Sequence, residues 1–236
     1  MKVAIHQPHY FPWLGYLNKM ASVDEFIILD EVQLSDKSNM CRNRFLTKTG
    51  KERYLTVSFE KKDYMKKRFC DVRLNTEVNW QRDHRNFLID TYGKLVGFNE
   101  VWSEIKHIFE KSYETAYEVS MDSILVLREL FDIRTPLIYQ STIDYCKQTR
   151  KNDLVLSLCE AVHAQIYLSG NGAKKYMQVD NFVKKGIKVE FQEFSHPCYP
   201  QAFSSVFIPN LSSLDLLFNC GIEASRHIFW CSIENK

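Results

Sequence analysis

The chain has 236 residues, of which 45% are hydrophobic and 25% charged, as is usual for one large globular domain or a domain with an insertion. Its formal net charge of +2 excludes strongly basic nucleic-acid-binding proteins. The 7 cysteines include no CxxC pair, which gives no indication of a zinc site or a disulfide framework. No secretory signal and no apolar run of about 20 residues is present, so we expect a cytoplasmic protein without a membrane span.

The first part of the chain predicts two strands, a helix and a hairpin. Residues 3–5 and the continuous apolar run 26–29 indicate strands that are buried on both faces, as in a parallel sheet. Between them, apolar residues at helical spacing follow Pro12, and proline is favoured in the first turn of a helix. Residues 42–59 alternate between apolar and polar on either side of Gly50, which is typical of a β-hairpin.

The middle of the chain, about residues 76–135, predicts a helical insertion. Three apolar stripes with the helical period follow one another there. We expect the stripes to bury four large side chains, namely Trp80, His84, Trp102 and Phe131.

Strands and helices alternate again after this insertion. Residues 137–139, 166–168 and 189–194 predict further strands, and an S-x-x-D pattern at Ser212 predicts a capping box near the end. The expected fold is a single α/β domain over residues 1–236 with an open, mainly parallel, Rossmann-like sheet. Ligands of such sheets bind outside the carboxyl ends of the strands.

A motif rich in functional side chains stands where the first strand meets the first helix. Its sequence, HQPHYFPW at residues 6–13, is interrupted by two prolines and therefore is not regular structure. One interpretation is a substrate pocket with His6 or His9 as general base; the alternative is a rigid turn with one buried histidine. We expect His6 to serve the chemistry and His9 the substrate contact. The other candidate contacts are Gln7, Tyr10 and Trp13.

A glycine-containing loop follows the strand predicted at 166–168. Its backbone N–H groups can hold an anion, and a lysine can add charge. No Walker pattern is present, and the alternative is a tight turn between strand and helix. The candidate contacts are Ser169, Gly170, Asn171, Gly172 and Lys174.

A third polar motif, HPCYPQ, follows the strand predicted at 189–194. His196 is a candidate catalytic residue, and Tyr199 and Gln201 are candidate substrate contacts. Because this motif, the N-terminal motif and the glycine loop each follow a predicted strand, we expect all three to line one cleft.

Charged and polar groups follow the second predicted strand. Asp30 and Gln33 are candidate substrate contacts. The carboxylates of Asp30 and Glu31 could bind a ribose hydroxyl, an amine or a metal, and Arg42 and Arg44 could bind phosphate. The alternative, to which we give equal weight, is that these charged side chains form salt bridges at the surface and bind no ligand.

Ordered motifs along nearly the whole chain resemble the WbqC-like family. They read HQPHYFPWLGY at 6–16, DEVQ at 30–33, RNR at 42–44, YLTV at 54–57, YLSGNGAKKY at 167–176, HPCYPQ at 196–201 and LSSLDLLFNCG at 211–221.

This resemblance implies a role in gene clusters for O-antigen and similar bacterial surface polysaccharides, where members have been suggested to transfer glycine or another acyl group onto an amino sugar. The expected function is thus N-acyl transfer, aminoacyl or glycyl, from an activated donor to a nucleotide-linked amino sugar. Arg42, Arg44 and Lys174 would contact the diphosphate. We predict no DNA partner, no metal and no tightly bound cofactor; tRNA as acyl donor is possible but not indicated.

Two other functions remain open. Residues 12–16, PWLGY, are similar in spacing to the P-H-x-G-H motif of nucleotidylyltransferases, although Trp13 and Tyr16 stand where that motif has histidines. Nucleotidyl transfer would require Mg²⁺ and release diphosphate. A non-catalytic sugar-nucleotide-binding protein is the third possibility.

Overall fold

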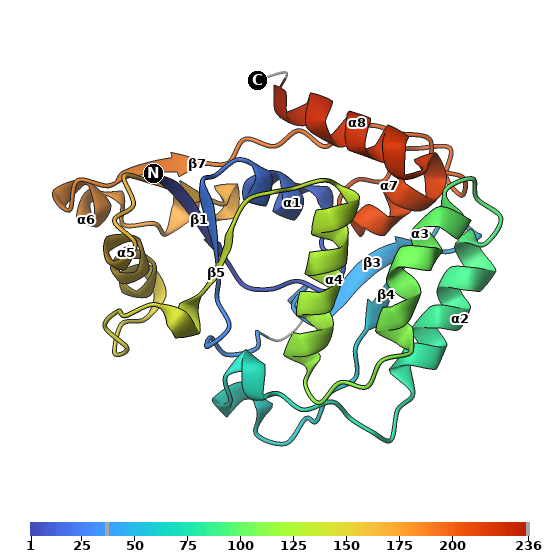
Figure 1. Ribbon diagram of the computed structural model, residues 1–236, viewed down its shortest axis with the longest axis horizontal. Coiled ribbons are helices and arrows are strands. Elements are labelled where there is room, and N and C mark those ends of the chain that lie inside the picture. Colours follow the sequence, from blue (N-terminus) through green and yellow to red (C-terminus); the bar gives the residue numbers. More distant parts are fainter. Residues whose placement is uncertain (36–37, 235–236) are drawn as a thin grey trace. The chain divides into compact units, whose positions relative to one another are not determined.

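The computed structural model describes residues 1–35 and 38–234 and divides into two compact units, each described here by itself. The first unit contains Met1–Gln7, Asn18–Glu31 and Arg134–Phe194. The second contains Pro8–Leu17, Val32–Ile133 and Ser195–Lys236. The architecture is α/β with a parallel sheet, a separate hairpin and helices, as the sequence predicted (Figure 1).

The described residues of the first unit form a five-stranded sheet. Its order is β5-β2-β1-β6-β7, and each neighbouring pair is parallel. The strands are β1 (Lys2–His6), β2 (Glu25–Ile28), β5 (Leu137–Tyr139), β6 (Ile166–Ser169) and β7 (Lys188–Phe191). The centres of β1 and β2 are almost wholly buried, which explains their continuous apolar sequences.

The strand order reverses between β1 and β6. From β1 the chain builds outward through β2 to β5, and it then returns to add β6 and β7 on the other side of β1. The ladder between β1 and β6 ends at the pair Ala4–Leu168, whereas the ladder between β1 and β2 continues to His6. The two strands at the reversal therefore stop pairing before their carboxyl ends.

The side chain of a buried lysine donates a hydrogen bond to the backbone of β1 just after the ladder between β1 and β6 ends. Lys19, on α1 (Leu14–Ala21), is 3% exposed, and its Nζ donates to the Ile5 carbonyl at 3.0 Å. Burial lowers the pKa of Lys19 to about 7 because an ammonium group loses its hydration there. The boundary between the units falls within α1, after Leu17, and the helices that belong wholly to this unit are α5 (Lys151–Ala161) and α6 (Val179–Lys184).

The second unit combines an antiparallel hairpin with helices. The hairpin pairs β3 (Arg42–Leu46) with β4 (Glu52–Thr56). The helices are α2 (Trp80–Tyr92), α3 (Phe98–Ile105), α4 (Ala116–Leu130), α7 (Ser213–Cys220) and α8 (Ile222–Glu234).

The structure buries three of the four side chains that we expected to be buried in the helical insertion. Trp80, His84 and Phe131 have 4% or less of their surface exposed. Trp102 is only half-buried, although its ring stacks against those of Phe98 and Phe109. Within residues 1–35 and 38–234, no helix is long and apolar enough to cross a membrane.

Candidate functional site

His6 is the last residue of β1, at the carboxyl edge of the parallel sheet. Its Nδ1 lies 2.9 Å from the carbonyl oxygen of Gln7. A carbonyl oxygen only accepts hydrogen bonds, so Nδ1 carries the hydrogen, and in the neutral ring the lone pair is then on Nε2. This tautomer is the one in which Nε2 can take a proton from a substrate.

The predicted glycine loop begins directly after β6. Ser169 ends the strand and is buried, and its carbonyl accepts from the backbone N–H of Gln192 at 2.8 Å. A short 3-10 helix, Asn171–Lys175, follows Gly170. Lys174 is exposed, and its ammonium group lies 5.4 Å from the centre of the Phe191 ring at the end of β7.

Neither the backbone conformation nor the packing of the described residues requires a glycine at position 170 or 172. Gly170 has φ −68° and ψ 146°, which any residue adopts, and Gly172 does not have a positive φ either. Apart from the glycine itself and its two chain neighbours, no described residue has an atom within 4 Å of a Cβ built at either position. The backbone here is thus open to the approach of another group, as at phosphate-binding turns.

The two carboxylates after β2 are already engaged within the first unit. Asp30 is buried and accepts from the backbone N–H of Ser141 at 3.0 Å and from its hydroxyl at 2.5 Å, which ties the end of β2 to the turn after β5. Glu31 pairs with Lys147 at 2.8 Å. This geometry favours a structural role for Asp30. Among the described residues, no group of three His, Cys, Asp or Glu that could hold a metal is found.

The second half of the N-terminal motif is embedded in the second unit. Tyr10 is fully buried, and its hydroxyl is 2.9 Å from Nδ1 of His84. Burial lowers the pKa of His84 to about 4, so the ring is neutral at pH 7. Phe11 has a positive φ of 37°, and its carbonyl accepts from Asn43 at 2.7 Å. These bonds favour packing over substrate contact for Tyr10.

His9 and Trp13 also lie in the second unit. His9 is largely buried, with its ring 5.0 Å from that of Tyr16. Trp13 is half-buried and forms an isolated bridge with Ser212. Its indole occupies the place of a side chain at Gly15, where an added Cβ would come within 2.2 Å of the ring. The glycine of the PWLGY segment is therefore needed to seat Trp13.

The HPCYPQ motif surrounds a buried aspartate. Asp215 accepts from the hydroxyls of Tyr92 and Tyr199, both at 3.0 Å, and from Gln201 at 3.2 Å. Desolvation raises the pKa of Asp215. Tyr199 and Gln201 thus have partners inside the unit. The predicted capping box is wrong in part, because Ser212 caps α7 but the Asp215 side chain points to this network instead.

His196 is half-buried beside this network. Its Nδ1 lies 2.9 Å from the carbonyl of Pro197, so its lone pair is also on Nε2. Burial lowers the pKa of His196, which favours the neutral ring that a base requires.

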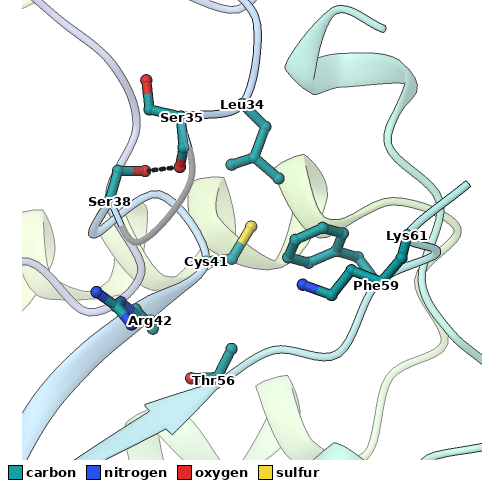
Figure 2. A pocket seen from close by; sticks show the side chains of 8 residues that line it. All are labelled: Leu34, Ser35, Ser38, Cys41, Arg42, Thr56, Phe59 and Lys61. Atoms are coloured by element: carbon teal, nitrogen blue, oxygen red, sulfur yellow. Dashed lines mark hydrogen bonds between the residues drawn. The ribbon is translucent and has the colours of Figure 1, made fainter. Parts of the chain in front are cut away.

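The structure separates the two candidate arginines. Arg44 pairs with Glu52 at 2.6 Å and donates to the Asn210 carbonyl at 3.0 Å. Arg42 instead lies with its guanidinium 4.3 Å from the centre of the Tyr54 ring and lines a small pocket (Figure 2). Gln33 is exposed and forms an isolated bridge with Arg68.

The first unit thus brings His6, Asp30 and the segment from Ser169 to Lys174 to one edge of its sheet. The second unit brings Tyr199 and Gln201 together at Asp215. That one cleft holds all these motifs stays a prediction. Sequence reasoning missed Lys19, and it assigned Asp215 to a capping box rather than to this network; a lysine in a mostly apolar helix was the available signal for Lys19.

Comparison with known proteins supports the motif assignment. A family model described as "WbqC-like protein family" matches residues 7–227. The "Uncharacterized protein Rv1507c" of Mycobacterium tuberculosis (strain ATCC 25618 / H37Rv) is 29% identical over 232 residues, which is 98% of each chain. No solved structure shows a significant match. Because the family model spans most of its length, the chain belongs to the WbqC-like protein family.

Proposed function

We propose that this protein is a cytoplasmic N-acyltransferase that transfers an aminoacyl, glycyl or related acyl group to a nucleotide-linked amino sugar of bacterial surface polysaccharide, such as O-antigen. One observation supports this proposal most directly. The strand order of the parallel sheet reverses between β1 and β6, and both strands end in polar segments, His6–Gln7 and Ser169–Gly172. Nucleotide ligands of open α/β sheets bind at such a reversal.

The proposed reaction uses His6 as general base. The sugar amine attacks the acyl carbonyl carbon, and His6 Nε2 takes the proton that the amine loses. A C–N bond forms, the bond from the acyl carbon to the donor's leaving group breaks, and the proton passes from His6 to that leaving group. The tautomer set by the Gln7 carbonyl supports this role.

The glycine loop is the proposed binding element for the oxyanion and the nucleotide phosphates. Backbone N–H groups at Gly170–Gly172 would stabilise negative charge on the acyl oxygen or a phosphate, and Lys174 would add a positive charge. The absence of any described atom beyond the chain neighbours within 4 Å of a Cβ at Gly170 or Gly172 supports a ligand that approaches the backbone itself.

The decisive experiment is mass spectrometry of reaction mixtures. Purified protein is incubated with nucleotide-linked amino sugars and, in separate reactions, with an acyl-CoA, an aminoacyl adenylate or an aminoacyl-tRNA. The proposal expects one donor to yield the sugar nucleotide with an amide-linked acyl group. The folded His6→Ala variant should lose this product. Failure of every donor, with the sugar nucleotide nevertheless bound, would refute acyl transfer.

Nucleotidyl transfer is the second candidate, since the same strand reversal favours any nucleotide. Diphosphate release that depends on added Mg²⁺ would distinguish it from acyl transfer. A non-catalytic sugar-nucleotide-binding protein would give binding without turnover on any donor.

A further inference from the structure

One buried cation of the first unit has no anionic partner among the described residues. Lys19 is almost fully buried, and its Nζ donates to the Ile5 carbonyl at 3.0 Å. Within the described part of the chain this ammonium group forms no second hydrogen bond and no ion pair, although it carries three N–H donors and a full charge. Proteins normally pair a charge that they bury. The described residues therefore leave the charge of Lys19 uncompensated.

The titratable groups that face Lys19 from the neighbouring elements supply no negative charge. Burial lowers the pKa of Lys19, and Cys159 of α5 is the group that raises it in turn. Burial raises the pKa of the Cys159 thiol to about 12, so this thiol is neutral at pH 7. Tyr167 of β6, which interacts with Cys159, has a pKa raised by burial as well. Glu160, beside Cys159 in the sequence, forms an ion pair with Lys185 at 2.6 Å.

The hydrogen bond to Ile5 places this charge at the strand reversal. The ladder between β1 and β6 ends one residue before Ile5, and its register, continued by one residue, sets Ser169 level with Ile5. Neighbouring strands of a sheet lie about 4.8 Å apart. The Lys19 ammonium thus lies at the level of Ser169, beside the point where Gly170 begins the glycine loop. His6, the titratable group that follows Ile5 on β1, can be neutral or positive but not negative.

A second donor on the same helix also lacks a partner. Asn18 is 1% exposed, and its Oδ1 accepts from Nε2 of Gln192 at 2.8 Å, just beyond the end of β7. The Nδ2 of Asn18 has no hydrogen-bond partner among the described residues. The backbone N–H of Gln192 donates to the Ser169 carbonyl at 2.8 Å, so Asn18 is tied to the same edge of the sheet as Lys19. Two neighbouring buried side chains of α1 therefore offer N–H donors there, and an anion is the group that accepts from such donors.

We propose that Lys19 is the buried counter-charge for the diphosphate of a nucleotide held at the Gly170–Gly172 loop, and that binding of the diphosphate draws one proton onto Lys19. The inference rests on the proposed binding of a sugar nucleotide at the strand reversal. In the free protein, desolvation favours the neutral amine because no negative charge offsets the ammonium. A diphosphate at the loop supplies that charge in surroundings of low dielectric, where a buried lysine acts on it without touching it. Lys19 is thus charged when the site is filled.

Isothermal titration calorimetry of the full chain with uridine, thymidine, cytidine, guanosine and adenosine diphosphates measures this proton. Each titration is run at about pH 8.5 in two buffers of different ionisation enthalpy, since the difference in heat gives the number of protons taken up; histidines of ordinary pKa, about 6.5, and nucleotide phosphates are deprotonated there. The wild type should take up nearly one proton with a diphosphate that binds. Because one proton is linked to binding, its affinity should fall by about tenfold between about pH 8 and 9.

Three variants assign the proton to a residue. Lys19→Met keeps an unbranched side chain without the charge, so this variant should bind with no proton uptake. The matched control is Lys188→Met, at the amino end of β7 on the opposite edge of the same sheet; Lys188 is exposed, so this variant should keep the uptake and the affinity of the wild type. His6→Ala should also keep the uptake, which assigns the proton even if circular dichroism shows Lys19→Met to be unfolded.

Four results would overturn the role of Lys19. They are no binding of any of the diphosphates, binding by the wild type without proton uptake, unchanged uptake in a folded Lys19→Met, and loss of the uptake in His6→Ala. Binding without uptake leaves acyl transfer intact, whereas uptake without an acylated product refutes acyl transfer alone. The two proposals therefore fail separately.

Discussion

Substitution of the loop glycines by alanine separates a ligand-binding role from a folding role. Gly170→Ala and Gly172→Ala add a methyl group where no described atom beyond the chain neighbours lies within 4 Å and where φ is not positive. The native backbone therefore accepts alanine without strain, whereas the unfolded chain loses conformational freedom. Each variant should be more stable by about 0.4–1 kcal/mol, which raises Tm by roughly 1–4 °C for a chain of this length.

The same substitutions should impair function if a ligand approaches the loop backbone. A methyl group there displaces the ligand, so we expect sugar-nucleotide affinity and kcat/KM to fall by about tenfold or more, since 1.4 kcal/mol of lost binding is tenfold. Urea unfolding measures the first effect, and calorimetry with the product assay measures the second.

Gly186→Ala is the matched control in the same unit. Gly186 is also free of neighbours within 4 Å among the described residues, but its φ is +73°, so alanine should destabilise by about 1 kcal/mol. The reasoning is refuted if Gly170→Ala and Gly172→Ala destabilise as Gly186→Ala does. It is equally refuted if they stabilise the protein and leave ligand affinity unchanged.

Three further predictions concern charged and titratable groups. His6→Ala should lower kcat by about 10²–10⁴ and His9→Ala should mainly raise KM, measured in the acyl-transfer assay; an inactive His196→Ala beside a near-normal His6→Ala would contradict these roles. Asp215→Ala leaves two buried tyrosine hydroxyls without their acceptor, which costs about 1–3 kcal/mol each, but it also removes a carboxylate that is desolvated in the folded state. We expect the free energy of unfolding, measured in urea, to fall by about 2–4 kcal/mol. A fall below about 0.5 kcal/mol would contradict the network. The pKa of Lys19 is lowered to about 7 in the folded state, so the unfolded chain binds more protons between pH 7 and 10. The stability of the wild type relative to Lys19→Met should therefore rise with pH over that window. A difference that does not change with pH would contradict the lowered pKa.

Local apolar patterns in the sequence were sufficient to predict the strands and helices. The apolar run at 26–29 is continuous because β2 is covered on both faces, and the alternation in 42–59 reflects a hairpin with one exposed face. Predicted and observed ends differ by a few residues, as for 189–194 against Lys188–Phe191, because strand ends are set by pairing with neighbours rather than by composition.

The α/β class, the parallel sheet, the hairpin and the family could all be predicted from the sequence, since each depends on short-range periodicity or on ordered motifs. The roles of individual polar residues, in contrast, depend on contacts that form only in the folded chain. Arg42 and Arg44 are two positions apart on one strand, yet Arg44 pairs with Glu52 while Arg42 lines a pocket with Lys61. The partners of Asp215 include Tyr92, 123 residues away in the chain. A hydrogen bond depends on distances between atoms in space, which sequence spacing does not encode across such separations.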